Sequence, residues 1–353
     1  MKKSIFSILS TAVVFLTMSS PARAADCGEV SITEMNWASS QIITEVSKFL
    51  MEQGYGCKVT KVPSATVTAA ASLAETGKPD IATEMWVNSS PVYAKLEKEG
   101  KVTTVAQVFS DGGEEGWWIP EYLAKSNPEL TKIEGILANP AAVGGLFHNC
   151  PDGWGCRIAN DNYKVAFDFE KNKLDVFNHG SGETLATSIA DAYASKKPWF
   201  GYYWGPTAIL GKYKMVKVDV GPYVKEAHDC SQKTDCANPQ KSSWPPSPVV
   251  TGVTNDFSSK NPQIAELMSK VSFTNDQLNG LLAWKKDNNA SAEEAAARFI
   301  QNESGVWGGW LNKSAQEKLG ALITQPIQES LSLKSLQSKI NALESRVKAL
   351  EAK

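Results

Sequence analysis

Residues 30–37 read VSITEMNW, a strand-like run that ends on a tryptophan. The run predicts a β-strand at 30–35, and the residues after it predict a helix at about 39–53, with Ser39 or Ser40 as the N-cap. The alternation continues with an expected strand at 58–62, a helix from Ser64 to about Thr76 and a strand at 80–85. This β-α-β-α-β order predicts an α/β fold with a parallel sheet covered by helices on both faces.

A second alternation follows. Strands are expected at 141–147, 173–177 and 198–204, and helices at 157–170 and 181–195. Two stretches, SDGGEEG (110–116) and WPPSP (244–248), resemble crossings between lobes, because clustered glycines and prolines interrupt regular elements. After the second crossing, VVTGVT predicts a strand and 261–322 reads as helical throughout. We therefore expect two α/β lobes with a cleft between them, the first lobe built from both ends of the chain.

The predicted organisation has five segments. They are a signal peptide at 1–24, the first part of lobe 1 at 25–112, lobe 2 at 113–248, the second part of lobe 1 at 249–328, and a helical tail at 329–353.

The first 24 residues have the pattern of a cleaved secretory signal peptide. Two lysines precede an apolar run, and Ala22-Arg23-Ala24 forms an A-x-A site. Asp26 precedes Cys27 and no lipobox does, so lipidation of Cys27 is the weaker interpretation. Removal of Lys2, Lys3 and Arg23 takes the net charge from −2 to −5, which argues against a nucleic-acid partner. The mature protein is expected to be exported to the periplasm.

All six cysteines follow the predicted cleavage site, and an even number in an exported chain predicts disulfides. Two pairs, six residues apart, are close enough to join locally: Cys150 with Cys156, and Cys230 with Cys236. Cys27 and Cys57 remain, and each precedes an expected strand. Neighbouring parallel strands start side by side, so these two cysteines should also meet.

Tryptophans follow several expected strands. Trp37 comes after SITEM, Trp86 after IATEM, and Trp204 ends WFGYYW. Ligands of open parallel sheets bind beyond the carboxyl ends of strands, so these rings should converge on one cleft. Trp154, in NCPDGWGC (149–156), would be a fourth wall. The alternative, that the rings fill a core, suits the helical end better, where the tryptophans are Trp284, Trp307 and Trp310.

An aromatic cage suits a quaternary ammonium group, which has a positive charge and no N–H to donate. Each desolvated contact with a π face contributes roughly 0.5–2 kcal/mol. Gly155 and Cys156, at the start of an expected helix, would add backbone N–H groups for an anion, with glycine allowing close approach. A cage beside an anion site predicts a zwitterionic ligand. Sugars also stack on tryptophan but need a polar fringe that is sparse here, so a sugar-binding protein is the more distant alternative.

At these residues the sequence resembles the periplasmic glycine betaine/proline betaine-binding proteins of ABC importers. GWGC, YYWGP and the tryptophan of IATEMW carry the resemblance, which covers most of 27–325. It implies a type II periplasmic binding protein fold and delivery of the ligand to an inner-membrane permease with its ATPase. It also implies that Trp86, Trp154 and Trp204 form the cage, with the amides of Gly155 and Cys156 on the carboxylate.

Two departures from the family pattern bear on the ligand. Family members have a histidine four residues after the first cage tryptophan, where this chain has Ser90. In EEGWW (114–118), Glu114 or Glu115 could face the cleft, although a solvated hinge is the simpler interpretation. A carboxylate there would repel a betaine and would complement choline or a protonated N-oxide. The stretch EMNW, which contains Trp37, is also similar to the choline-binding and trimethylamine N-oxide-binding relatives. Glycine betaine or proline betaine is thus the expected ligand, with choline or trimethylamine N-oxide as alternatives.

No catalytic motif is present. The three histidines are scattered, and neither a nucleophile elbow nor H-E-x-x-H occurs. We expect no enzyme activity, no cofactor and no metal site. The last 25 residues carry a heptad seam of leucine, isoleucine and valine, so 331–350 either self-associates as a short coiled coil or lies as a helix on its own lobe.

Overall fold

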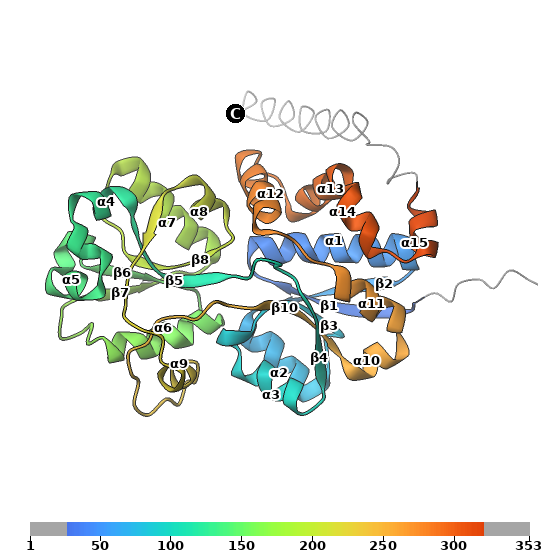
Figure 1. Cartoon of the computed structure of the whole chain (residues 1–353), viewed down its shortest axis with the longest axis horizontal. Helices are drawn as coiled ribbons and strands as arrows, with labels where there is room; N and C mark the ends of the chain where they lie inside the picture. Colours follow the sequence, from blue (N-terminus) through green and yellow to red (C-terminus); the bar gives the residue numbers. More distant parts are fainter. Residues whose placement is uncertain (1–26, 321–353) are drawn as a thin grey trace, which may run out of the picture.

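A computed structural model describes residues 27–320 of the chain. It contains two five-stranded sheets that lie beside each other, each with its own helices (Figure 1). We call them lobe 1 and lobe 2. The predicted signal peptide and heptad tail lie outside the described residues, so the predictions made for them are not addressed. Within residues 27–320, no helix has both the length and the apolar character needed to span a bilayer.

Lobe 1 contains the sheet β2-β1-β3-β10-β4. Its strands are β1 (Glu29–Met35), β2 (Lys58–Ser64), β3 (Ile81–Trp86), β4 (Val102–Gln107) and β10 (Val249–Thr254). Its helices before the first crossing are α1 (Ala38–Tyr55), α2 (Thr66–Thr76), η1 (Val87–Ser89) and α3 (Pro91–Lys98). Those after β10 are α10 (Asn255–Lys260), α11 (Pro262–Lys270), α12 (Asn275–Asp287), α13 (Ala292–Asn302), α14 (Ser304–Trp307), η4 (Gly308–Trp310) and α15 (Lys313–Lys318).

Lobe 2 contains the sheet β7-β6-β8-β5-β9. Its strands are β5 (Glu114–Pro120), β6 (Leu146–Asn149), β7 (Asp175–Asn178), β8 (Gly201–Gly205) and β9 (Met215–Lys217). Its helices are α4 (Glu121–Ser126), η2 (Pro128–Thr131), α5 (Ile133–Ala138), η3 (Pro140–Val143), α6 (Gly155–Ala166), α7 (Gly182–Ser195), α8 (Ala208–Lys212) and α9 (Lys225–Ser231).

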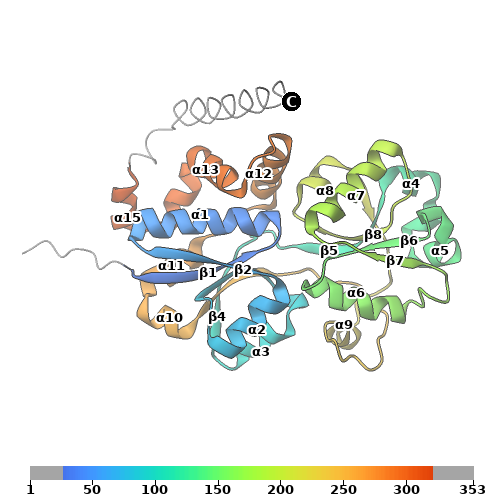
Figure 2. The same ribbon diagram turned by 180° about the vertical axis from the view of Figure 1, so that it is seen from behind.

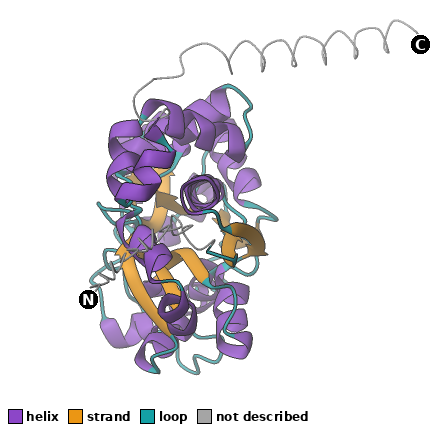
Figure 3. Cartoon of the chain, turned by 90° about the vertical axis from the view of Figure 1, so that its right-hand side faces the viewer, coloured by secondary structure: helices purple, strands orange, loops and turns teal. Residues whose placement is uncertain are grey.

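Helices cover both faces of each sheet. In lobe 1, α1, α12 and α13 lie on one side and α2, α3 and α10 on the other (Figures 1 and 2). In lobe 2, α7 and α8 lie opposite α6 and α9. Viewed along the long axis, strands lie between two outer layers of helix (Figure 3). The helices pack on the sheets because their sequences are amphipathic. In α1, for example, Ile42, Ile43, Val46 and Leu50 form one buried apolar stripe.

The two-lobed α/β fold predicted from the alternating pattern is confirmed. Lobe 1 takes strands from residues 29–107 and 249–254, and lobe 2 takes its strands from 114–217. The predicted segment boundaries themselves stay predictions. The two crossings pair with each other: the Gly113 N–H donates to the Ser247 carbonyl at 2.8 Å, and the Ser247 N–H donates back at 3.1 Å.

Three local predictions need correction. The sheet of lobe 1 is mixed, because β10 returns from lobe 2 and runs antiparallel to β3 and β4. The stretch 141–147 is not one strand, since Gly144 and Gly145 have positive φ values and separate η3 from β6. The N-cap of α1 is Trp37, without a side-chain cap bond, rather than Ser39 or Ser40. Both serine hydroxyls bond elsewhere, to the side chain of Glu84 and to the amide of Met35.

All three disulfides form as predicted: Cys27–Cys57, Cys150–Cys156 and Cys230–Cys236. The first joins the starts of β1 and β2, which are parallel neighbours in register, as expected from their positions just before the two strands.

Candidate functional site: an aromatic cavity between the lobes

A cavity lies where the two lobes meet, enclosing about 310 Å³ of space between atoms, part of it open to solvent. Both lobes contribute to its lining, which consists of Trp37, Thr66, Trp86, Ser89, Glu115, Trp154, Gly155, Cys156, Tyr202 and Trp204. Five of these ten residues are aromatic, one is acidic, and none is lysine or arginine. The chemistry of the lining therefore complements a cation rather than an anion.

The structure brings together the four tryptophans that the sequence placed after strands and on the short loop. Each is 5–8% exposed. The rings of Trp37 and Trp154 meet edge to face at 5.2 Å, and those of Trp154 and Trp204 at 5.0 Å. Trp86 packs against Phe109 at 5.9 Å. Trp154 thus contacts two of the other three rings at steep angles, and all four rings line the cavity.

The position of each ring follows from the end of an element. Trp86 is the last residue of β3, Trp204 lies next to the end of β8, Trp37 caps α1, and Trp154 is the N-cap residue of α6. Strand ends and helix starts meet in the cleft of an α/β protein, which is why the rings converge.

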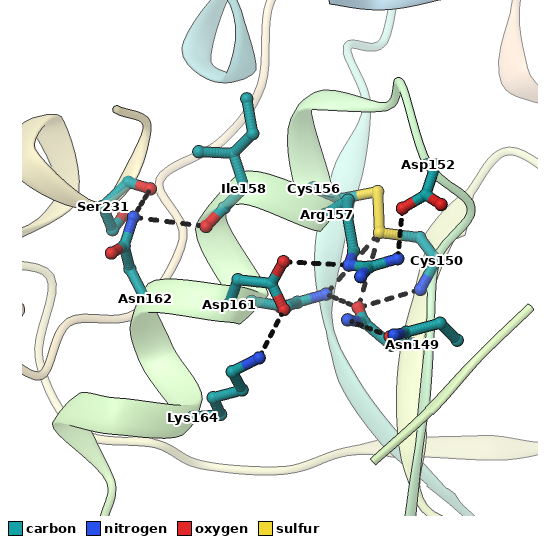
Figure 4. A network of polar contacts seen from close by, with 12 residues as sticks. Asn149, Cys150, Asp152, Cys156, Arg157, Ile158, Asp161, Asn162, Lys164 and Ser231 are labelled. Carbon is teal, nitrogen blue, oxygen red and sulfur yellow. Dashed lines mark hydrogen bonds and ion pairs between the residues drawn. A yellow bond between two sulfur atoms is a disulfide. The ribbon is translucent and has the colours of Figure 1, made fainter. Parts of the chain in front are cut away.

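The loop that carries Trp154 is tied internally as well as by its disulfide (Figure 4). The Asn149 Oδ1 accepts hydrogen bonds from the Cys150 amide at 2.9 Å and from Asn160 Nδ2 at 2.8 Å. Arg157 bonds to Asp152 in the loop and, at 2.9 Å, to Asp161 one helical turn further on. The loop is thus anchored to β6 and α6 before anything enters the cavity.

The same loop also touches lobe 1. Trp154 Nε1 donates to Asn36 Oδ1 at 2.7 Å, and the Val67 amide donates to the Gly153 carbonyl at 3.1 Å. A Cβ added to Gly155 would lie 2.2 Å from the carbonyl oxygen of Ser89. Glycine was expected at Gly155 so that a ligand could approach. In the structure it is lobe 1 that comes close, through Ser89.

Glu115 is an acid at the wall of the cavity, 2% exposed, and not a solvated hinge residue. It lies opposite Trp204 on the neighbouring strand. Its carboxylate accepts hydrogen bonds at 2.8 Å from the hydroxyls of Tyr202 and Ser247, and longer ones from Ser89. Burial raises the pKa of Glu115, and these hydroxyl donors act against that rise. The adjacent Glu114 is exposed and pairs with Lys217 at 3.1 Å.

Among the serines, the structure places Ser89 rather than Ser90 at the cavity. Ser90 is buried as the N-cap of α3. The 3₁₀ turn over Val87–Ser89 decides which hydroxyl faces inward, and the spacing from the tryptophan does not reveal that turn. Thr66 and Tyr202 also line the cavity and were not expected there.

Glu84 is a polar residue at the site that the sequence did not reveal. It lies in β3, fully buried, with φ of 53°. Its Oε1 accepts hydrogen bonds from the indole nitrogens of Trp37 and Trp86, the latter at 3.4 Å, and from the Ser39 hydroxyl at 2.9 Å. The sequence signal was an acid between buried positions of a central strand.

A neighbouring, wider pocket shares Trp37 and Trp204 with the cavity and also contains Glu183, Lys285 and Lys286. Its charges are mixed, and it lacks Trp86 and Trp154. The smaller cavity, with all four tryptophans and one acid, has the more specific chemistry.

The other predicted features have these positions. Trp307 and Trp310 are buried in the helical end, where Trp310 packs on Phe273 and Phe299. Two of the histidines are not scattered: His148 Nδ1 lies 3.0 Å from His179 Nε2, and burial lowers the pKa of each to about 4.

Solved structures with the same fold include several transport proteins. The glycine betaine/L-proline-binding protein ProX of Borrelia burgdorferi has a TM-score of 0.66 at 16% identity, covering 82% of this chain and 99% of its own. Lactococcal OpuAC, closed on glycine betaine, has a TM-score of 0.63 at 18% identity, covering 81% and 100%. An ABC-transporter choline-binding protein in complex with choline has a TM-score of 0.64 at 18% identity, covering 84% and 98%.

The model of the family "Substrate binding domain of ABC-type glycine betaine transport system" matches residues 28–302, most of the chain. This is a family of extracytoplasmic solute-binding proteins that serve transport, not of enzymes. The resemblance noted in GWGC, YYWGP and IATEMW is therefore confirmed, and the chain belongs to this family of ABC-type glycine betaine-binding proteins.

Proposed function

We propose that this protein captures a small methylated ammonium compound in the cavity walled by Trp37, Trp86, Trp154 and Trp204. It then delivers the compound, from the periplasm, to an ABC permease in the inner membrane with its ATPase. The observation that carries this proposal is four indole rings around a cavity with one acid and no basic side chain. Enclosure between the lobes would remove water from the cation, which strengthens each contact with a π face.

Within this class, Glu115 favours a ligand without a carboxylate. An ionised Glu115 would attract a cation and accept a hydrogen bond from the hydroxyl of choline. A protonated Glu115, made accessible by its raised pKa, would donate to the oxygen of trimethylamine N-oxide. The negative end of a betaine would face repulsion from the same carboxylate when it is ionised.

Glycine betaine is the second candidate, and a different observation supports it. Gly155 and Cys156 line the cavity at the first turn of α6, a helix of 12 residues. The first N–H groups of a helix have no intrahelical acceptor, so they can bind a carboxylate.

Calorimetric titration with choline, trimethylamine N-oxide, glycine betaine, carnitine and a set of sugars tests the proposal. We expect binding of at least one methylated amine and none of the sugars. Binding of sugars alone would overturn the proposed class of ligand.

The variant Glu115→Gln should separate the candidate ligands. A hydrogen bond to a charged group contributes about 1.5–3 kcal/mol, so choline binding should weaken about 10- to 150-fold. Glutamine still offers N–H donors, so trimethylamine N-oxide should still bind, and glycine betaine should bind at least as well as before. Glu114→Gln, one residue away and exposed, is the matched control and should change none of these affinities. Equal, small effects of the two variants would show that Glu115 does not select the ligand.

Removal of the Cys150–Cys156 disulfide in the Trp154 loop should weaken binding more than removal of the Cys230–Cys236 disulfide. Cys150→Ser/Cys156→Ser frees the loop, which must then be ordered on binding, so we expect affinity to fall about 10-fold or more. Cys230→Ser/Cys236→Ser opens a loop of the same spacing, and neither of its cysteines lines the cavity. It should lower thermal stability and leave affinity unchanged, which titration and thermal unfolding together would measure. Equal affinity losses in the two double variants would contradict a specific role for the Trp154 loop.

A further inference from the structure

The side chain behind the cavity wall is Glu84. It lies in β3 between β1 and β10, and it does not itself line the cavity. Two of the four wall tryptophans, Trp37 and Trp86, donate their only side-chain N–H groups to the same carboxylate oxygen, Trp86 at 3.4 Å. They come from different elements, the start of α1 and the end of β3.

This shared acceptor fixes the orientation of both rings. An indole can rotate about two side-chain bonds, and its N–H is its one polar direction. With both N–H groups held on Glu84 Oε1, the faces of Trp37 and Trp86 are set relative to each other. Ser39 donates to the same oxygen at 2.9 Å and connects the pair to the first turn of α1.

The backbone at Glu84 adds a second observation. Its φ of 53° is in the left-handed region, which non-glycine residues adopt only at a cost in free energy. The other carboxylate oxygen, Oε2, is buried and has no hydrogen-bond partner. A buried acid with one oxygen unsatisfied, held in an unfavourable backbone conformation, is not explained by stability alone.

We propose that Glu84 is a positioning residue of the cavity: its carboxylate sets the two indole rings of Trp37 and Trp86, and its charge state sets how strongly they hold a cation. An ionised carboxylate accepts stronger hydrogen bonds from the indoles than a neutral acid does, and it adds negative charge behind two of the π faces. The second half of this inference rests on the proposed function.

Burial raises the pKa of Glu84 to about 8, and the hydrogen bonds from Trp37, Ser39 and Trp86 oppose that rise. The acid is therefore mainly neutral at pH 7 and mainly ionised at pH 9. A cation in the cavity favours the ionised form, so binding at neutral pH releases a proton to solvent. Affinity should then rise with pH through this range. The groups that face Glu84 are Trp37 at the N-cap of α1, Ser39 of α1 and Trp86 of β3, and none of them titrates between pH 7 and 9. The ionisable groups that line the cavity are Glu115 and Tyr202.

The first experiment needs no ligand. In ¹H–¹⁵N spectra of the full chain between pH 6.5 and 9, assigned with single Trp→Phe variants, the indole N–H signals of Trp37 and Trp86 should shift together with one midpoint. Glu84→Gln should abolish the shift, and Glu115→Gln should leave it. Trp154, whose N–H donates to Asn36, is the internal control and should not shift. Independent titration of Trp37 and Trp86, or indole signals that Glu84→Gln leaves unchanged, would overturn the positioning role, and absent titration would overturn the charge role.

The second experiment is titration with choline and with trimethylamine N-oxide across the same pH range. We expect choline affinity to rise about fivefold or more from pH 6.5 to 9 in Glu115→Gln, where Glu115 cannot contribute, and to be constant in the double variant Glu84→Gln/Glu115→Gln. A rise of the same size in the double variant would overturn the charge role of Glu84. Wild-type protein that binds no methylated amine at any pH, while its two indole signals still titrate together, would refute the proposed function and support the positioning role.

Discussion

Replacement of Trp154 by alanine is expected to weaken binding of the methylated amine about 100-fold. Trp154 contacts two of the other three wall rings and joins the lobes through Asn36, so its loss opens the wall and removes an interlobe bond. Buried tryptophans at the centre of a binding site commonly account for losses of 2 kcal/mol or more. Titration of the variant with the best ligand of the wild-type protein measures the effect.

Trp310→Ala is the matched control for Trp154→Ala. Trp310 is as buried as the wall residues but packs among Phe273 and Phe299, in the helical end of lobe 1. Its truncation should lower the free energy of unfolding by about 3–5 kcal/mol and leave affinity unchanged. Comparable losses of affinity in the two variants would contradict the assignment of Trp154 to the site.

Gly155→Ala should impair closure of the lobes on the ligand. The added Cβ would lie 2.2 Å from a backbone oxygen, that of Ser89 in lobe 1, and backbone cannot move aside as a flexible side chain does. An overpacked contact costs about 1–3 kcal/mol, and we expect this cost in the observed arrangement, where Gly155 touches Ser89, and not in one with the lobes further apart. If the ligand needs the observed arrangement, affinity should fall about 5- to 150-fold. Small-angle scattering with and without ligand would show a smaller contraction than in the wild-type protein.

Gly280→Ala controls for the general effect of a glycine-to-alanine change. Gly280 lies on the exposed side of α12, and no atom lies within 4 Å of its added Cβ. The variant should bind normally and be more stable by roughly 0.5–1 kcal/mol, because alanine favours a helix interior. A Gly155→Ala protein that binds and contracts like Gly280→Ala would exclude the proposed contact as a determinant of closure.

The fold and the tryptophans were accessible from the sequence because each depends on local order. Alternating strands and helices predict an α/β sheet wherever they occur, and a ring placed directly after a parallel strand lies at the carboxyl edge of its own sheet. The direction of β10 was not accessible. VVTGVT reads as a strand in either orientation, and its antiparallel pairing follows from the path of the second crossing.

Glu84 shows why part of the site was missed. The triplet TEM occurs twice, in SITEMNW and in IATEMW. The first acid, Glu34, is on β1 and pairs with Lys61 of the edge strand β2 at 2.8 Å. The second, Glu84, is on the central strand β3 and is buried against Trp37. Identical local sequences thus give an ion pair in one strand and a buried acid in the other, and only sheet order distinguishes them.

The bond between Cys150 and Cys156 has a consequence for when the protein becomes competent. Disulfides form in oxidising compartments, whereas cysteine thiols are kept reduced in the cytosol. If the loop depends on this bond as expected, a newly made chain would have a poorly formed cavity until export and oxidation. On the proposed function, the precursor would then not bind its ligand inside the cell, and capture would begin only outside the cytoplasm.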